Sequence, residues 1–222
     1  MKKVLSLIVG LIIFSFLPII GWGVADISGF TQNPFRVTFI VMMAILSVFV
    51  VILVPNEGRG YGDGKKIVKR QKLTILILQI VPLLVTIFSP FMDRHQIATF
   101  GESSAIRVLG LLLSLLGFVL MNWSIMVLGK QFSVNVTIQD NHKLITNGPY
   151  KYIRHPRYSG IIVFLIGIPI VYRTWLPLIV DILLIGVLLW RIKDEEKLMY
   201  QEFKSDWENY RRKTYSLIPF LF

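Results

Sequence analysis

Lys130 to Tyr158 spell KQFSVNVTIQDNHKLITNGPYKYIRHPRY, a polar stretch between two long apolar regions. It holds two of the three histidines of the chain, His142 and His155, together with Arg154 and Arg157. Because the flanking apolar runs are long enough to cross a bilayer, we expect this stretch to lie at the membrane surface, close to where the chain re-enters lipid. Polar side chains gathered at such a boundary indicate a site of chemistry.

The composition outside this stretch is that of a membrane protein. The chain has 222 residues, of which 54% are hydrophobic and 17% charged, and its mean hydropathy is +0.64. Cysteine is absent, which excludes disulfides and thiolate ligands, so we expect no metal site. The net charge of +11 is held in short clusters between apolar runs, as in loops that face an anionic leaflet. Binding of nucleic acid is therefore not expected.

Four apolar runs precede the polar stretch, each of about the 20 residues that a helix needs to cross roughly 30 Å of hydrocarbon. The first is expected to be a retained span and not a signal peptide, because no A-x-A-like cleavage site follows it and further spans come after. In the fourth run, Gly110 and Gly117 would allow close approach of another helix. The four runs cover residues 1–24, 35–54, 73–91 and 105–128.

Two shorter apolar runs, 159–171 and 175–190, follow the polar stretch and are separated by a tight turn. They predict a helical hairpin, thin or tilted in the bilayer. Beyond it, residues 191–213 alternate in charge and carry apolar side chains at helical spacing, which predicts an amphipathic cytoplasmic helix that continues the last span and lies against the bundle or the lipid surface. The fold class expected is all-α: a polytopic membrane bundle of about six spans, with N-terminal spans (1–104) and a core (105–222).

The distribution of charge predicts the orientation of this bundle. With six spans, the basic segments all fall on one side of the membrane: the start of the chain, 56–72, 129–157 and the C-terminal helix. The links on the other side are nearly neutral. The positive-inside rule then places both termini and the polar stretch in the cytoplasm.

Two constellations of polar residues are candidates for function. In the first, Arg154, His155 and Tyr158 surround a proline, which keeps His155 out of the helical region and would direct backbone N–H groups at a ligand. The alternative is that Arg154 and Arg157 only anchor the topology and that Tyr158 is an interfacial aromatic residue. In the second, Arg191 and Glu195 lie four residues apart on one helix face, with Glu196 beside them. Their alternative is a surface ion pair of about 0.3–0.5 kcal/mol.

Two further ionisable residues receive less weight. Asp181 lies within the last apolar run but close to its start, so it is placed near the opposite interface. His95 is a lone histidine in a link on the predicted outer side.

Two segments of the chain resemble those of a known protein family. The segment from Leu128 to Gly160, with the pattern GPYxYxRHPxYxG, and the segment from Arg191 to Phe220, with RxxxEE, resemble the isoprenylcysteine carboxyl methyltransferase family and, more widely, membrane phospholipid methyltransferases. The resemblance covers roughly the C-terminal half. Residues 1–104 show nothing beyond spans, and no glycine-rich turn typical of soluble methyltransferases occurs.

The resemblance implies that S-adenosylmethionine binds at the cytoplasmic face and that a lipid or lipid-modified acceptor enters from the bilayer. It further implies catalytic roles for Arg191 and Glu195, with Arg191 meeting the acceptor. The residues implied in cofactor binding are Asn135, His142, Lys143, Leu144, Ile145, Tyr150, His155, Pro156, Arg157, Tyr158 and Glu195. The run 129–158 is thus the expected cofactor-binding loop, and 105–222 the expected methyltransferase core.

The residues are compatible with more than one class of methyl acceptor. A carboxylate needs no base, and Arg191 would hold it bidentately. An amine or thiol must lose a proton, to which His155 or Glu196 could contribute. Two other classes compete with a methyltransferase: an NADPH-dependent membrane lipid reductase, and a non-enzymatic transporter or assembly factor. The sequence leaves the oligomeric state undetermined.

Overall fold

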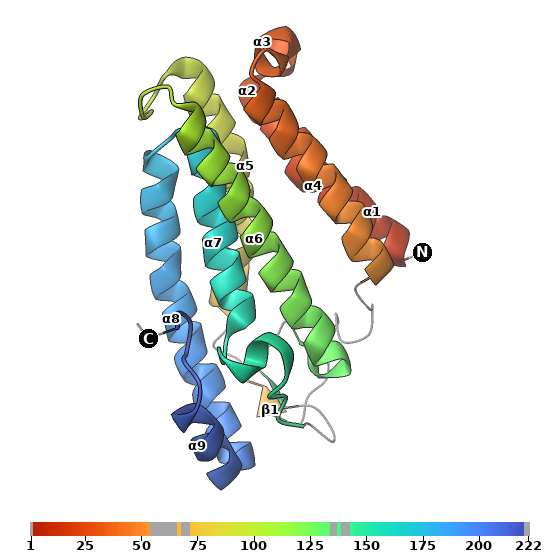
Figure 1. Ribbon diagram of the computed structural model, residues 1–222, viewed down its shortest axis with the longest axis vertical. Coiled ribbons are helices and arrows are strands. Elements are labelled where there is room, and N and C mark those ends of the chain that lie inside the picture. Colours follow the sequence, from red (N-terminus) through yellow and green to blue (C-terminus); the bar gives the residue numbers. More distant parts are fainter. Residues whose placement is uncertain (1, 54–65, 68–71, 134–136, 139–142, 220–222) are drawn as a thin grey trace.

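The computed structural model describes residues 2–53, 66–67, 72–133, 137–138 and 143–219. Within this part the chain is almost entirely helical, as predicted, and its long helices run side by side (Figure 1). The sequence did not predict the one small sheet of the described residues, in which β1 (Lys66–Ile67) pairs antiparallel with β2 (Thr137–Ile138). This pairing joins the basic loop after the second apolar run to the polar stretch.

The first predicted span is helical but bends sharply at its end. It consists of three consecutive helical segments, and at Gly23 the backbone takes φ 110°, a conformation that favours glycine. The chain turns there by 83° into two short helices. The segments are α1 (Lys2–Leu11), the π-helix η1 (Ile12–Phe16), α2 (Leu17–Trp22), η2 (Val24–Asp26) and α3 (Ile27–Thr31).

Three described helices are long and apolar enough to cross a membrane: α4 (Pro34–Leu53), α5 (Lys72–His95) and α6 (Ser104–Leu128). The bent N-terminal pair makes a fourth if it counts as one span. After α6 come the short helices η4 (Gly129–Gln131) and η5 (Gly148–Lys151). The prediction of about six spans is therefore confirmed only as a helical membrane bundle with three or four candidate spans.

The second arm of the C-terminal hairpin continues past the membrane boundary, which confirms the prediction that the charged helix extends the last span. The first arm, α7 (Pro156–Val171), is a shorter apolar helix. The second, α8 (Leu176–Phe203), runs without interruption from the last apolar run into the charged segment. It stops at Lys204, which has φ 46°, and α9 (Ser205–Arg212) turns back beside it. The prediction of one helix over 191–213 is wrong, since two helices share that range.

Reciprocal glycines hold α6 against α7. A Cβ atom at Gly117 would lie 2.3 Å from the backbone nitrogen of Phe164, and one at Gly160 would lie 2.5 Å from that of Met121. Gly110 meets the backbone of α7 in the same way. The two backbones can approach this closely only because the side chains are missing. This confirms the predicted role of Gly110 and Gly117.

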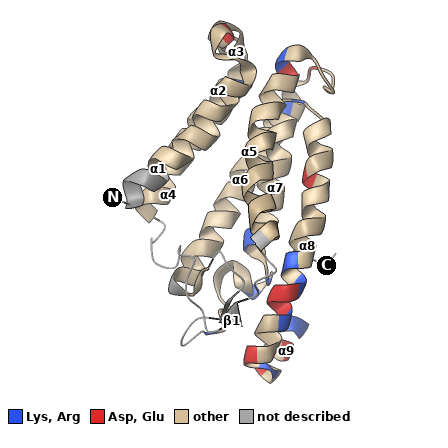
Figure 2. Ribbon diagram, turned by 180° about the vertical axis from the view of Figure 1, so that it is seen from behind, with Lys and Arg blue, Asp and Glu red and all other residues tan. Residues whose placement is uncertain are grey.

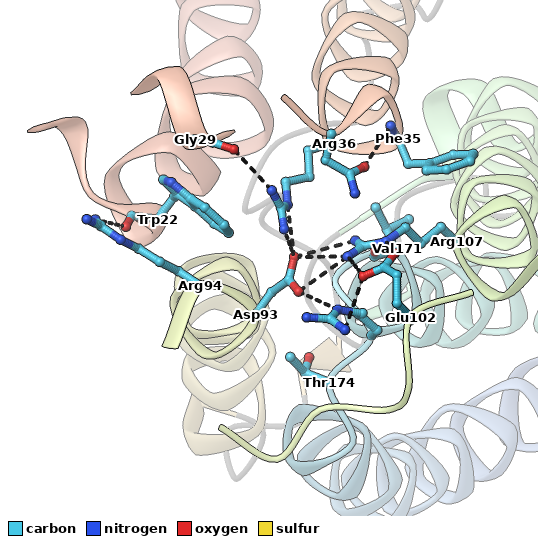
Figure 3. Close-up of polar contacts among 12 residues, drawn as sticks. Trp22, Gly29, Phe35, Arg36, Asp93, Arg94, Glu102, Arg107, Val171 and Thr174 are labelled. Carbon is cyan, nitrogen blue, oxygen red and sulfur yellow. Dashed lines mark hydrogen bonds and ion pairs between the residues drawn. The ribbon is translucent and has the colours of Figure 1, made fainter. Parts of the chain in front are cut away.

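A buried ionic cluster joins four parts of the chain at the end of the bundle where α5 ends and α6 begins (Figure 3). The carboxylate of Asp93 is inaccessible to solvent and accepts hydrogen bonds from Arg36 of α4 (Nε, 2.9 Å) and from Arg173, in the turn after α7 (Nε, 2.7 Å). Arg107 of α6 lies 3.4 Å from it and also donates to Glu102 at 2.7 Å. Pairing of this kind is what makes burial of such charges tolerable.

The two ionisable residues that received less weight lie apart from that cluster. His95 ends α5, and its ring packs 4.5 Å from that of Phe91. Asp181 is only 3% exposed, and its carboxylate has no hydrogen-bond partner among the described residues. This side chain therefore points into the protein, while its position near the opposite membrane interface stays a prediction.

We predict that Gly117→Ala lowers the melting temperature of the protein in detergent. The added methyl group would collide with the backbone of α7, so the helices must separate; overpacking of this kind costs about 1–3 kcal/mol. Gly186→Ala is the matched control, because a Cβ there meets no atom within 4 Å. Equal shifts for both substitutions would contradict the packing interpretation.

Candidate active site

A cavity lies where α6 ends and α7 begins, at the opposite end of these helices from the Asp93 cluster. Its walls come from segments far apart in the sequence: the polar stretch, the first turn of α7, the middle of α8, and α9. The space between these walls, including the open mouth and the solvent in it, is about 880 Å³. The separate candidate constellations around His155 and Arg191 therefore share one cavity.

Most of the residues predicted for the site line this cavity. They come from the segment before η5, from η5 itself, from the start of α7 with the residue that precedes it, and from α8: Lys143, Leu144, Ile145, Tyr150, His155, Arg157, Tyr158, Arg191 and Glu195. Pro156 is buried as the first residue of α7 and does not line it. Asn135 and His142 lie outside the described residues.

The hydroxyl group of Tyr158 connects the two constellations. It donates a hydrogen bond to Glu195 (Oε2, 2.8 Å) and accepts one from Arg191 (Nε, 2.8 Å). Tyr158 and Arg191 are 5% and 3% exposed. The alternative interpretation of Arg191 and Glu195 as a surface ion pair is thus wrong, because a tyrosine from another helix bridges them at the wall of a cavity.

His155 lies between the two glutamates of α8. Its Nε2 is 3.2 Å from Glu196 Oε1, and its Nδ1 is 4.0 Å from Glu195 Oε1. Arg154 Nε also donates to Glu196, at 2.9 Å. Burial opposes ionisation of Glu196, but the hydrogen bonds from His155 and Arg154 and their charges outweigh it and lower its pKa to about 2. Glu196 is therefore an anion that fixes the turn beside the cavity.

The C-terminal tail completes this turn from the other side. We call residues 214–217 the terminal strap. The backbone N–H groups of Arg154 and His155 donate to the carbonyl groups of Tyr215 (2.8 Å) and Ser216 (3.0 Å), and Ser159 Oγ donates to the carbonyl of Leu217 at 2.5 Å. The expectation that backbone N–H groups of this turn face a ligand is wrong for these two, since the strap occupies both.

Aromatic and apolar groups form the rest of the wall. Tyr150 is 7% exposed, and its carbonyl oxygen accepts a hydrogen bond from the hydroxyl of Tyr210 in α9, at 2.7 Å. Burial raises the pKa of Tyr150, and the charge of Glu195 adds to this effect, so the phenol stays neutral. The guanidinium of Arg157 lies 4.9 Å from the centre of the Phe132 ring.

These groups suit a ligand that combines both charges with an aromatic ring. S-adenosylmethionine carries an ammonium, a carboxylate, a sulfonium and an adenine. Glu195 offers a carboxylate, and the buried Nε of Arg157 has no hydrogen-bond partner among the described residues. Tyr150 and Trp207 supply aromatic surface within the same cavity. The residues present therefore fit this cofactor.

Sequence reasoning missed part of the site. Arg154 belonged to a candidate constellation but was not predicted to be a site residue, yet it joins the polar stretch to α8 through Glu196 and lines the cavity. Trp207 and Tyr210 were recognised as an apolar helix face, but nothing in their spacing indicated that they line a cavity. The terminal strap acts through main-chain carbonyl groups, which leave no pattern in a sequence.

We predict that Glu196→Gln reduces stability at neutral pH and that this difference narrows in acid. The folded-state pKa of about 2 lies below the ordinary value of 4.5. Ionised Glu196 therefore stabilises the fold above about pH 4.5, and this contribution is lost as the pH falls towards 2. Melting temperatures of both proteins across this range test the prediction. A gap between the two that stays constant with pH would contradict it.

Comparisons with known proteins agree with the resemblance. The model of the isoprenylcysteine carboxyl methyltransferase (ICMT) family matches residues 108–201. A probable protein-S-isoprenylcysteine O-methyltransferase of Oryza sativa subsp. indica is 30% identical over 186 residues, which cover 78% of this chain and 95% of the relative. Protein-S-isoprenylcysteine O-methyltransferase B of Arabidopsis thaliana is 27% identical over 202 residues, covering 87% and 96%.

A third relative, the protein-S-isoprenylcysteine O-methyltransferase of Schizosaccharomyces pombe, is 34% identical over 100 residues, or 42% of this chain and 41% of its own length. The similarity to the rice protein extends well beyond the family match, into the N-terminal helices. The chain therefore belongs to the isoprenylcysteine carboxyl methyltransferase family and is a membrane methyltransferase that uses S-adenosylmethionine.

Proposed function

We propose that this protein methylates the carboxylate of a lipid-modified acceptor, such as an isoprenylated cysteine, that reaches the cavity from the bilayer. The observation that carries the proposal is the hydrogen-bonded path from Glu195 through Tyr158 to Arg191. The hydroxyl group of Tyr158 thus lies between Glu195, whose carboxylate suits the cofactor, and Arg191, whose guanidinium suits a carboxylate acceptor. The names of the rice and Arabidopsis relatives support the same acceptor class.

We propose that residues 105–222 form the methyltransferase core, with 129–158 as its cofactor-binding loop. Glu195, Tyr150 and the run 143–145 would hold the cofactor, along with the first turn of α7. Asn135 and His142 keep the role that the family resemblance implies. The support from the structure is that α7 and α8 bring the described members of this set into one cavity.

When bound, S-adenosylmethionine supplies a methyl group on a positively charged sulfur. Arg191 would orient the acceptor carboxylate: its Nε holds Tyr158, and its amino groups suit bidentate binding. With the carboxylate held by Arg191, one of its oxygens would accept the methyl group that the cofactor supplies, and the electron pair of the carbon–sulfur bond would remain on sulfur. The carboxylate is already ionised, so His155 and Glu196 serve as positioning residues. The buried walls exclude water and align the reactants.

We propose that the cavity and both termini face the cytoplasm and that six segments cross the membrane. The apolar helix α7 and the apolar part of α8 would be the last two crossings. The support is the distribution of charge: the charged half of α8 and α9 lie together at one end of the bundle, as Figure 2 shows. Positive residues in short loops favour the cytoplasmic side.

We predict that the wild-type protein binds S-adenosylmethionine and that two substitutions affect different steps. Glu195→Gln removes a charge-assisted contact of about 1.5–3 kcal/mol and should weaken cofactor affinity roughly 10- to 100-fold. Arg191→Ala should abolish turnover while leaving that affinity nearly unchanged. Isothermal titration and a methyl-transfer assay measure the two quantities.

Glu208→Gln, on the exposed face of α9, is the charge-matched control for this pair and should change neither quantity. An equal loss of affinity and turnover in Arg191→Ala would refute the assignment of Arg191 to the acceptor. A melting temperature raised by NADPH and unaffected by S-adenosylmethionine would refute the methyltransferase itself.

We predict on which side of the membrane two segments of the protein lie. Single introduced cysteines can test this, because the native chain has no cysteine that would also react. Gly101→Cys lies in the link before α6, where a Cβ meets no other atom. It should react with a membrane-impermeant maleimide in intact cells. Glu208→Cys in α9 should react only after the cells are permeabilised. The reverse pattern would invert the proposed orientation.

A further inference from the structure

A second cleft lies on the other side of the turn that carries His155. Four of its lining residues come from one face of α8, spaced by helical periodicity: Leu189, Ile192, Lys193 and Glu196. The first two are apolar and the last two charged, so the cleft crosses the boundary where α8 leaves its apolar run. In a helix that crosses a bilayer, this boundary lies at the level of the lipid headgroups.

The charge of this cleft is positive. Arg154 and Arg211 complete its wall with Lys193, so three cations face the single carboxylate of Glu196. Lys193 and Arg211 are exposed. Arg154 is already committed, through Nε to Glu196 and through Nη1 to backbone carbonyl groups of Arg211 and Thr214. The two exposed cations are therefore the ones that a ligand from outside would meet first.

We propose that this second cleft binds the headgroup of an anionic phospholipid, and that the bound lipid tightens binding of S-adenosylmethionine in the neighbouring cavity. The phosphate would contact Lys193 and Arg211, while the acyl chains continue along Leu189, towards the apolar run of α8. A cation near an anionic membrane surface contributes about 1 kcal/mol, so two of them select clearly for an anionic over a zwitterionic lipid.

The coupling to the cofactor follows from a wall that both pockets share. Arg154 lines both of them, and Glu196 lines the second cleft while holding His155 at the first. Ser216 of the terminal strap lines the second cleft, and its carbonyl accepts the backbone N–H of His155. A phosphate on Lys193 and Arg211 would draw α8 and the segment around Arg211 together and so fix His155 against the cofactor.

The inference rests on the proposed role of the cavity, but its first test does not require turnover. Protein in nanodiscs of phosphatidylcholine is compared with protein in nanodiscs containing phosphatidylglycerol, and retention of each lipid is measured by native mass spectrometry. We expect selective retention of phosphatidylglycerol. The double variant Lys193→Gln and Arg211→Gln should lower this selectivity by about 25-fold, since each lost cation removes roughly a factor of five.

Lys197→Gln with Arg212→Gln is the matched control. It removes the same charge from α8 and α9 at exposed positions outside the cleft, so it should keep the selectivity of the wild type. An equal loss in both double variants would overturn the proposal in favour of general surface charge. Melting temperatures in phosphatidylcholine establish that each variant is folded, and the two single variants separate the contributions of the cations.

The second measurement is cofactor affinity by titration in the same nanodiscs. We expect phosphatidylglycerol to lower the dissociation constant of S-adenosylmethionine by about fivefold, and the cofactor must raise lipid retention by the same factor, because coupling is reciprocal. Soluble glycerol phosphate should not replace the lipid, since it lacks acyl chains. Equal cofactor affinity in both lipids would overturn the coupling, whereas absence of cofactor binding in both would instead refute the proposed function.

Discussion

The carboxylate of Asp93 imposes the constraint on which the rest of the structure depends. A charge removed entirely from solvent has to be neutralised, and here three arginines from α4, α6 and the turn after α7 converge on it. Losing one partner of such a buried group typically costs about 3–5 kcal/mol. The cluster thus pins four segments together at one end of the bundle, whereas the lipid-facing surfaces of the helices provide little that would select a single arrangement.

The position of the cavity depends on the course of α7, which runs from the Asp93 cluster to the cavity. The glycines of α6 and α7 bring the two backbones into contact along their length, so the position of Arg173 at one end determines that of His155 at the other. At that end α7 presents Tyr158 to α8, where Arg191 and Glu195 bind its hydroxyl group. The cavity is therefore built on packed helices, and described residues of the polar stretch, from 131–133 and 143–158, complete its wall. This is the arrangement that methyl transfer by alignment of reactants requires.

The sequence was sufficient for whatever depends on periodicity or on a local motif. Apolar runs predicted the helices, the glycines of α6 predicted its contact with α7, and the family resemblance predicted nine of the 18 described residues that line the cavity. The sequence was insufficient where segments far apart in the chain meet through common side chains, such as arginine and aspartate, that form no motif. No sequence pattern indicated that one carboxylate, that of Asp93, would bind Arg36, Arg107 and Arg173. Likewise, no pattern marked the end of α8 at Lys204, which depends on the packing of α9 against α8.

The terminal strap has a consequence for the order in which the protein matures. Proteins emerge from the ribosome N-terminus first, and residues 214–217 follow every helix of the described chain. The spans can therefore enter the membrane and pack before the carbonyl groups that bind Arg154 and His155 exist. A chain that stops before residue 214 would therefore hold every described helix but lack the carbonyl groups that bind the turn beside the cavity.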